Sequence, residues 1–325
     1  MTAAVLRAVL LRLSARPDLG RALERSSWTR AFVRRFVAGT TPAEALDALA
    51  TLNGRGYLGA VTYLGENVAT PIAAARATDV YVHLLDEIAR RRLRVVPSLK
   101  LTHLGLDLGE EVCVANVVRV LERAATMATR VWIDMESSVY TDRTLDVYAR
   151  LRARFPHVAC VVQAYLRRTP ADVERLVGLG ATVRLCKGAY REPSAIAFPR
   201  KADVDAAYAR LAERFLSADA QARGVYVGFA THDERLHRHV AAAARTRGIG
   251  ADRWEVQMLH GIRPDLHRTV AATATLRVLV PFGEDWWGYF LRRLAERPAN
   301  LLFLVRNLKR RGGAYLTAPA SGDYS

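Results

Sequence analysis

The chain has 325 residues, of which 51% are hydrophobic. This length and composition suit one large or two medium globular domains and exclude a disordered chain. The net charge of +16 favours a nucleic-acid-binding protein at first sight, but the 48 basic residues are spread along the whole chain and predict solvated faces instead. The three cysteines, Cys113, Cys160 and Cys186, are widely spaced, which indicates reduced thiols of a cytoplasmic protein.

The chain before residue 57 is predicted to contain helices only. Ala3–Leu13 is apolar but interrupted by arginines at helical spacing, which indicates an amphipathic helix, not a signal peptide. This helix either packs on the core or touches a membrane surface. Thr41–Glu44 reads as a capping box, with proline at the first helical position, and predicts a helix that runs to about Leu52. Residues 1–56 are therefore expected to form an N-terminal helical segment.

From there, short apolar runs rich in β-branched residues alternate with amphipathic stretches. The predicted strands are Leu58–Leu64, Arg94–Leu101, Arg130–Glu136, Val158–Leu166, Thr182–Gly188, Val225–His232, Trp254–Gly261 and Arg277–Gly283. The predicted helices between them are Pro71–Arg92, Glu110–Thr129, Thr141–Arg154, Ala171–Gly178, Asp203–Gln221, Glu234–Arg247 and Pro264–Ala274. No run of about 18 uncharged apolar residues occurs, so no membrane-spanning helix is predicted.

This alternation indicates an α/β protein with a parallel sheet that helices cover on both faces. Eight such units are what a closed (βα)8 barrel of the TIM type requires. An open doubly wound sheet is the alternative, but no glycine-rich dinucleotide fingerprint follows any predicted strand. Residues 57–312 are expected to form the barrel together with a C-terminal substrate-binding helix, and residues 313–325 are expected to form a mobile tail.

Polar or charged residues stand at the ends of six consecutive predicted strands. They are Lys100, Asp134, Gln163, Lys187, His232 and His260. In a parallel barrel, the carboxyl ends of the strands face one mouth, where active sites are built. The pattern therefore predicts a functional site at that mouth.

A second group of polar residues lies on the helix predicted after the last strand. Tyr289, Arg292, Arg293 and Glu296 are three and four residues apart, so they share one helical face. Adjacent arginines near the mouth favour a bidentate clamp for a carboxylate, with Glu296 holding one of them. The alternative is a solvated surface helix.

Several of these segments resemble those of the proline dehydrogenase family. They are Ser98–Leu101, Ile133–Glu136, Gln163–Tyr165, Val183–Tyr190, Phe229–His232, Glu255–Gly261 and Tyr289–Glu296. The resemblance extends in order from about Leu58 to Asn300. It implies a flavoenzyme on a distorted (βα)8 barrel that oxidises L-proline to Δ1-pyrroline-5-carboxylate, the first step of proline catabolism, and passes the electrons to a membrane quinone.

The resemblance also implies a setting for this activity. Because the chain ends shortly after the arginine helix, we expect the monofunctional form, with handover of the product to a separate pyrroline-5-carboxylate dehydrogenase. We expect a cytoplasmic protein that can contact the inner face of the cell membrane, and we expect neither a metal site nor a nucleic-acid partner.

The resemblance further implies roles for individual residues. The FAD-binding residues would be Met135, Gln163, Arg184, Lys187, Gly188, Ala189, Thr231 and His232. The residues that bind proline would be Lys100, Tyr289, Arg292 and Arg293, with Glu296 in support. Arg184 would lie against the isoalloxazine ring, where a fixed guanidinium stabilises the negative charge of the reduced flavin. Asp134 would be the active-site carboxylate; it could accept the amine proton or only pair with Lys100 or Arg184.

One position departs from the family pattern, and two other functions remain open. Many relatives have a tyrosine where this chain has Leu279, so one side of the proline pocket is expected either to be more apolar or to be closed by another aromatic residue such as Tyr289. The first alternative function is that of another flavin-dependent barrel, similar to methylenetetrahydrofolate reductase. The second is that of a basic nucleic-acid-binding protein without a cofactor.

Overall fold

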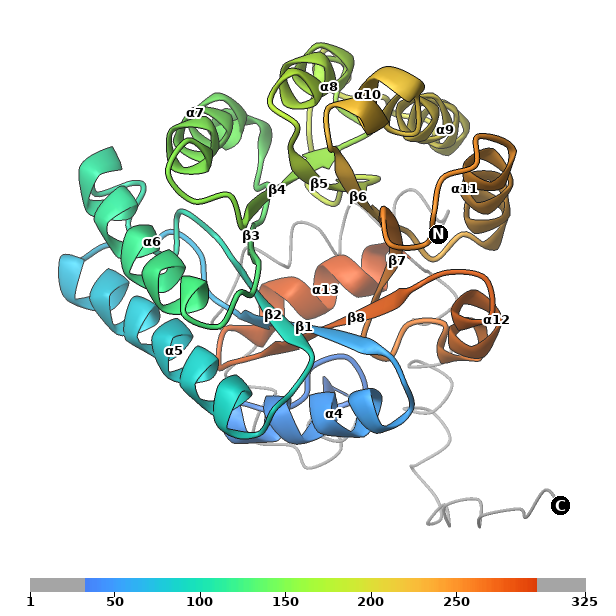
Figure 1. Ribbon diagram of the computed structural model, residues 1–325. Helices are drawn as coiled ribbons and strands as arrows, with labels where there is room; N and C mark the ends of the chain where they lie inside the picture. Colours follow the sequence, from blue (N-terminus) through green and yellow to red (C-terminus); the bar gives the residue numbers. More distant parts are fainter. Residues whose placement is uncertain (1–32, 297–325) are drawn as a thin grey trace, which may run out of the picture.

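The computed structural model describes residues 33–296, with side chains to residue 293. Its strands form one closed barrel in the order β1 to β8, with β1 paired to β8 and every pair parallel (Figure 1). The strands are β1 Leu58–Tyr63, β2 Val95–Leu99, β3 Val131–Ile133, β4 Val158–Gln163, β5 Thr182–Cys186, β6 Tyr226–Ala230, β7 Trp254–Leu259 and β8 Leu276–Phe282. The predicted (βα)8 barrel is confirmed, and the open sheet is excluded. The predicted helix Ala3–Leu13 and the predicted tail lie outside the described residues.

The helices surround the barrel, except for the last of them, which lies at its mouth. They are α4 Pro42–Gly54, α5 Pro71–Arg90, α6 Glu110–Ala125, α7 Thr141–Arg152, α8 Thr169–Gly178, α9 Lys201–Phe215, α10 Ala218–Ala222, α11 Glu234–Thr246, α12 His267–Ala271 and α13 Trp286–Glu296, with short 3-10 helices η1 Ser138–Tyr140 and η2 Pro264–Leu266. The capping box at Thr41 is present.

Two helical predictions were wrong in detail. The single helix predicted over residues 203–221 is divided into α9 and α10, because the Ser217 side chain accepts a hydrogen bond from Ala220 N and begins a new helix. The helix predicted over residues 264–274 is a 3-10 turn followed by the short α12.

The interior of the barrel is polar near its mouth. Along β5, Val183 and Leu185 are fully buried, whereas Arg184 between them contacts side chains from β2 and β7. Neither of these strands is a neighbour of β5 in the sheet, so Arg184 points into the barrel. Side chains on the strands can therefore meet inside the barrel although their positions in the sequence are far apart.

Helix α13 departs from the regular barrel plan. It packs against Leu64 and Ile262, which follow β1 and β7, so it lies over the carboxyl ends of the strands. In a regular barrel the helix after the last strand joins the outer ring. Here α4 takes that outer position beside β1 and β8 (Figure 1). This exchange brings the arginines of α13 to the mouth.

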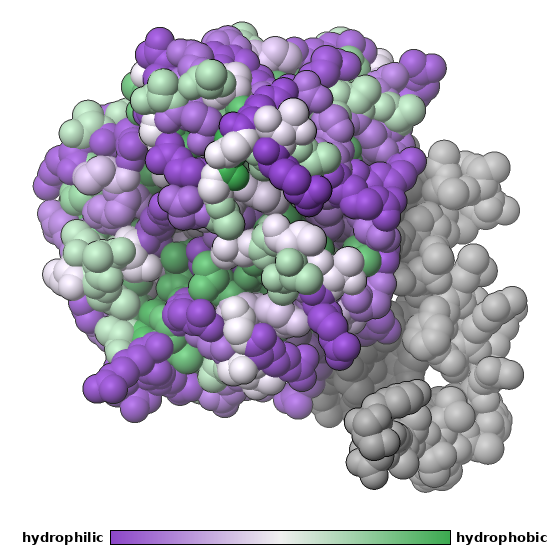
Figure 2. All heavy atoms as spheres, turned by 45° about the vertical axis from the view of Figure 1, so that its right-hand side comes forward, coloured by the Kyte–Doolittle hydropathy of each residue, from purple (hydrophilic) through white to green (hydrophobic). Residues whose placement is uncertain are grey.

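One face of the molecule can be followed in a space-filling view (Figure 2). Figure 2 shows mostly polar residues on one face, with apolar residues visible in a recessed area. Within residues 33–296, no helix combines the length and the apolar character that crossing a membrane requires.

Candidate active site

Arg184 lies at the centre of the site, inside the barrel. Counted over the whole residue, Arg184 is 6% exposed. Nη1 donates to Asp134 Oδ1 at 2.7 Å and to Ser98 Oγ at 3.0 Å, and Nε donates to Gln257 Oε1. The guanidinium carbon lies 4.7 Å from the centre of the Trp132 ring. Burial lowers the pKa of Arg184 and Asp134 opposes that shift, but an arginine remains protonated at neutral pH. The barrel therefore holds a fixed positive charge.

Two buried polar atoms on the adjacent strands β4 and β5 fit a bound flavin. Arg184 Nη2, a donor, and Gln163 Oε1, an acceptor, have no hydrogen-bond partner among the described residues. Buried polar groups are costly when they are left without a partner, so these two atoms are available to hydrogen-bond a bound ligand. A flavin ring presents both carbonyl oxygens and N–H groups, and it suits a donor and an acceptor together. Met135 lies beside them, and its carbonyl accepts from Gln163 Nε2 at 3.4 Å.

Gly188 and Ala189 follow β5 at the mouth. Gly188 has φ +113°, and a Cβ atom there would lie 2.1 Å from Tyr165 Cδ1. Only glycine fits, because both the backbone conformation and the Tyr165 ring exclude a side chain. Ala189 is half-buried beside it. The missing side chain at Gly188 therefore makes room for the Tyr165 ring, which packs directly against the backbone at this part of the mouth.

Lys187 belongs to a charged cluster on the same rim. Its Nζ lies 2.5 Å from Asp205 Oδ1 and 3.3 Å from Asp233 Oδ2. Lys201 and Arg235 contact the same carboxylates, so three cations share two anions. Burial acts to raise the pKa of Asp205, but hydrogen bonds from Lys187 and Lys201 outweigh it, and the pKa is lowered. The cluster therefore has one more positive than negative charge, which fits an anionic group such as the diphosphate of FAD.

Thr231 and His232 follow β6 and are held by backbone contacts. His232 Nε2 accepts from Leu259 N at 2.9 Å, so the neutral ring carries its proton on Nδ1. Thr231 Oγ1 accepts from Asp233 N at 3.2 Å, and the Thr231 carbonyl lies 2.8 Å from His237 Nε2. These contacts fix both predicted cofactor residues at the mouth.

Arg292 reaches the mouth from α13 and pairs with Glu66 of the β1–α5 loop. Arg292 Nη2 lies 2.6 Å from Glu66 Oε1, and Lys100 Nζ lies 3.7 Å from the same oxygen. Burial acts to raise the pKa of Glu66, but Lys100 and Arg292 outweigh it, and the pKa is lowered. Burial acts to lower the pKa of Arg292, but Glu66 raises it above its usual range. An ionised carboxylate therefore lies between these two cations.

The other predicted residues of α13 have different surroundings. The Arg293 guanidinium carbon lies 5.3 Å from the centre of the Tyr289 ring, and that of Arg292 lies 5.3 Å from the Tyr190 ring. Tyr289 also packs in an apolar cluster that includes Leu64. The clamp of adjacent arginines remains a prediction. Glu296 ends α13, and its side chain lies outside the described part of the structure.

Glu136 is a buried carboxyl group that the sequence analysis gave no role. It is 2% exposed, and its oxygens accept from Thr102 N at 3.1 Å and from Thr102 Oγ1 at 2.6 Å. Burial raises the pKa of Glu136 to about 7, although Thr102 and Lys100 oppose the shift. A group that titrates near neutral pH therefore lies beside the site.

Three further site residues also received no role from the sequence. Ser98 and Gln257 lie in segments that were recognised, and the strand period of two residues could have placed them inside the barrel with Arg184. Glu66 follows β1, and extending the strand-end argument to the first strand could have found it. Asp134 pairs with Arg184, and the carboxylate paired with Lys100 is Glu66.

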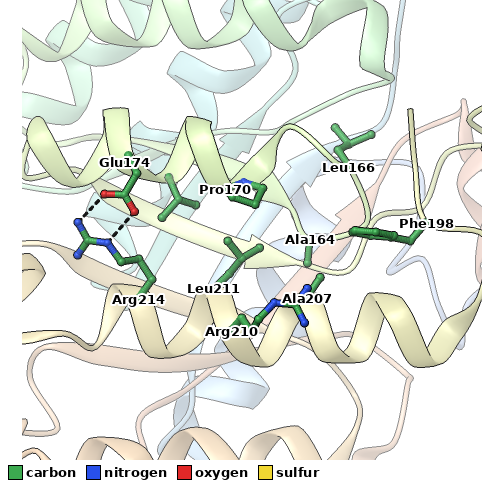
Figure 3. Close-up of a pocket in the computed structure, with 10 residues that line it drawn as sticks. Ala164, Leu166, Pro170, Glu174, Phe198, Ala207, Arg210, Leu211 and Arg214 are labelled. Atoms are coloured by element: carbon green, nitrogen blue, oxygen red, sulfur yellow. Dashed lines mark hydrogen bonds and ion pairs between the residues drawn. The ribbon is translucent and has the colours of Figure 1, made fainter. Parts of the chain in front are cut away.

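A separate pocket lies between α8 and α9, outside the barrel (Figure 3). It has a volume of about 270 Å³ and is lined mainly by apolar side chains, with the Glu174–Arg214 ion pair at one end. Its lining includes Leu166, Pro170, Val173, Phe198, Ala207 and Leu211. None of the predicted site residues lines this pocket, so we place the active site at the mouth.

The fold and the charged residues at its mouth define a (βα)8-barrel enzyme. A family model described as proline dehydrogenase matches residues 45–306. Proline dehydrogenase 2 of Bacillus subtilis (strain 168) is 34% identical over 290 residues, which cover 89% of this chain and 94% of the relative. Proline dehydrogenase of Deinococcus radiodurans is 35% identical over 308 residues, covering 93% and 97%. The chain belongs to the proline dehydrogenase family and is an oxidoreductase of proline catabolism.

Solved structures support the fold. Proline utilization A (PutA) from Bdellovibrio bacteriovorus superposes with a TM-score of 0.77 at 24% identity. The alignment covers 86% of this chain and 34% of that longer chain. The chain thus corresponds to about a third of that protein, and this match concerns the barrel architecture alone.

Proposed function

We propose that the chain catalyses the FAD-dependent oxidation of L-proline to Δ1-pyrroline-5-carboxylate and delivers the electrons to a membrane quinone. The observation that carries this proposal is the buried guanidinium of Arg184: its Nε and Nη1 atoms are held by hydrogen bonds, and its buried Nη2 atom has no hydrogen-bond partner among the described residues. Membership of the family supplies the substrate class.

Substrate binding is assigned to the cations around Glu66. The proline carboxylate would replace Glu66 on Arg292, because Glu66 already presents an ionised carboxylate there. Lys100, 3.7 Å from the same oxygen, adds a second positive charge. Arg293 and Tyr289 would complete the binding surface from α13. This binding would orient the ring of proline and exclude water from the mouth.

Arg184 and Lys187 are assigned to the cofactor. When bound, FAD would accept a hydride from the proline carbon next to nitrogen. Arg184 would stabilise the added negative charge without reorganising, since its contacts are already made. Lys187, Thr231, His232 and Gly188 would hold the remainder of the cofactor at the rim. Asp134 keeps the charge of Arg184 in place through its Oδ1 atom.

Contact with a membrane belongs to the same proposal, because quinones reside there. The excess of arginine in the chain favours an anionic lipid surface, to which each near-surface cation contributes about 1 kcal/mol. The imine product would pass to a separate pyrroline-5-carboxylate dehydrogenase.

The spectrum of the purified protein tests the proposal. We expect flavin absorbance that anaerobic L-proline bleaches, that a quinone restores, and that NADH leaves unchanged. Bleaching by NADH but not by proline would indicate a barrel similar to methylenetetrahydrofolate reductase. A colourless protein that FAD does not reconstitute would contradict the proposal, and salt-dependent DNA binding by that protein would favour the nucleic-acid alternative.

A further inference from the structure

Gln257 joins Arg184 to a second charged group deeper in the barrel. Its Oε1 accepts from Arg184 Nε, and its Nε2 donates to Glu255 Oε1 at 2.5 Å. A guanidinium can only donate hydrogen bonds, and an ionised carboxylate can only accept them. The orientation of the Gln257 amide is therefore fixed by its partners.

Glu255 is anchored in turn by a bidentate ion pair. It is 0% exposed, and its oxygens contact Arg277 Nε at 2.7 Å and Arg277 Nη2 at 2.9 Å. Tyr226 also donates to it at 2.9 Å, and Arg277 Nη1 donates to Gly59 O at 2.8 Å. Burial acts to raise the pKa of Glu255, but Arg277 outweighs it, and the pKa is lowered. The anchor is therefore ionised and fixed to β1, β6 and β8.

The space for the Gln257 amide is also built into the barrel. Gly228 on β6 lies in register with Arg184 of β5 and with Glu255 of β7. A Cβ atom at Gly228 would lie 2.3 Å from Gln257 Nε2, so any side chain there would displace the amide. A buried network in which each member has its partners is rigid.

We propose that Gln257 is a positioning residue that orients the Arg184 guanidinium towards the cofactor and thereby raises the reduction potential of the bound flavin. This proposal rests on the proposed function, because it requires FAD at the mouth. Gln257 and Asp134 hold Nε and Nη1, which leaves the buried Nη2 as the Arg184 donor without a partner among the described residues. Because Gln257 is neutral, it fixes Arg184 without cancelling the positive charge of the guanidinium. A second carboxylate at this position would cancel that charge.

The first test is Gln257→Met, which keeps the length of the side chain and removes both hydrogen bonds. At a fixed solution potential, we expect the ratio of reduced to oxidised flavin to fall about tenfold. For a two-electron couple, this corresponds to a reduction potential of the flavin that is about 30 mV lower. The potential is measured with a chemical reductant and a reference dye, so that proline is not needed. FAD content should remain close to that of the parent, because Lys187 and Gly188 are untouched.

Tyr226→Phe is the matched control. It removes one hydrogen bond to the same Glu255 but leaves Gln257 and Arg184 in contact. Both variants are expected to lower the melting temperature, and only Gln257→Met should lower the flavin potential. A network that serves stability alone predicts lower melting temperatures and parental potentials in both variants.

The second test is the pH dependence of the flavin potential in Gln257→Glu. When protonated, this side chain reproduces the glutamine arrangement: it accepts from Arg184 and donates to Glu255. When ionised, it adds negative charge beside Arg184. At each pH, the flavin potential of the variant is compared with that of the parent. The difference should vanish as pH falls, and the variant's potential should drop further below the parent's as pH rises. This holds even if Gln257→Met does not fold.

The outcomes separate the two proposals. A parental potential in Gln257→Met, or a Gln257→Glu potential that follows the parent at every pH, overturns the role of Gln257. A parent protein whose flavin is not reduced by proline, but whose potential still responds to Gln257 as described, overturns the proposed function and leaves the positioning role standing.

Discussion

The two arginines that carry the proposed chemistry are held in opposite ways. Arg184 is fixed inside the barrel by side chains from β2, from the end of β3 and from β7, and its side chain is 7% exposed. Arg292 is held at the mouth by Glu66, a carboxylate on a loop, and its side chain is 15% exposed. The first arrangement is suited to a permanent electrostatic role, and the second to exchange of one carboxylate for another. The difference indicates that stabilisation of the cofactor and binding of the substrate are separate tasks.

Removal of the interior arginine should produce the largest effect. In Arg184→Ala, we expect flavin reduction by proline to slow by about 10²–10³-fold, because a fixed donor at a developing charge is lost. FAD content should fall as well. Anaerobic single-turnover spectra and the ratio of FAD to protein measure both effects. Arg90→Ala, which alters an exposed arginine paired with Glu87, is the control and should match the parent. Normal reduction in Arg184→Ala would remove Arg184 from the site.

Conservative changes in α13 should weaken binding instead. Arg292→Lys and Arg293→Lys keep the charge but lose the planar fork. A hydrogen bond to a charged group contributes roughly 1.5–3 kcal/mol, so proline affinity should fall by about ten- to a hundredfold, with FAD content nearly unchanged. Glu296→Gln should produce a milder form of the same defect.

The alternative of a solvated helix makes the opposite prediction for α13. Exposed ion pairs contribute only about 0–1 kcal/mol, so all three variants would bind proline almost normally. Proline titrations within about twofold of the parent, a difference below 1 kcal/mol, would show that the clamp assignment is wrong.

Unlike Glu66, which pairs with Lys100 and Arg292, Glu136 makes no ion pair within the described part of the chain. Its pKa of about 7 in the folded protein exceeds the usual 4.5, so the folded state binds more protons between these values. The contribution of Glu136 to the free energy of unfolding should therefore fall as pH rises from 4.5 to 7. Glu136→Gln should remove this contribution and stabilise the protein above pH 7 by about 3 kcal/mol. Denaturant unfolding across that pH range measures the effect, and identical pH profiles in both proteins would contradict it.

The smallest effect is expected from Glu66→Gln. The change removes the carboxylate that proline must displace from Arg292, so proline should bind more tightly. The side chains of Arg292 and Glu66 are 15% and 25% exposed, and desolvation offsets much of the attraction in such a pair, so we expect a gain of roughly fivefold or less. Proline titration measures it. Weaker binding in this variant would mean that Glu66 supports the substrate site and does not compete with the substrate.

The sequence predicts the barrel well because strand and helix periods are local properties. All eight predicted strands overlap the observed ones, although β3 is shorter than expected and places Asp134 just past its end. The division of the helix at Ser217 was missed because one local cap overrode an otherwise continuous helical pattern.

The pairing of charges could not be predicted in the same way. Contacts such as Arg292–Glu66 join residues 226 positions apart, and no local pattern specifies them. The strand-end argument and the family resemblance named Arg184, Asp134 and Lys100, but they did not identify which carboxylate meets which cation. That choice depends on where α13 lies, and its position over the mouth departs from the regular barrel.

The division of tasks between Arg184 and Arg292 can be measured by rapid anaerobic reduction across a series of proline concentrations, with Arg184→Lys and Arg292→Lys compared side by side. We predict that Arg184→Lys lowers the limiting rate by about tenfold or more while the half-saturating proline concentration stays within about threefold of the parent. Arg292→Lys should show the converse pattern. If both variants change the rate and the half-saturation to the same extent, or if their patterns are exchanged, the division of tasks between the two arginines is wrong.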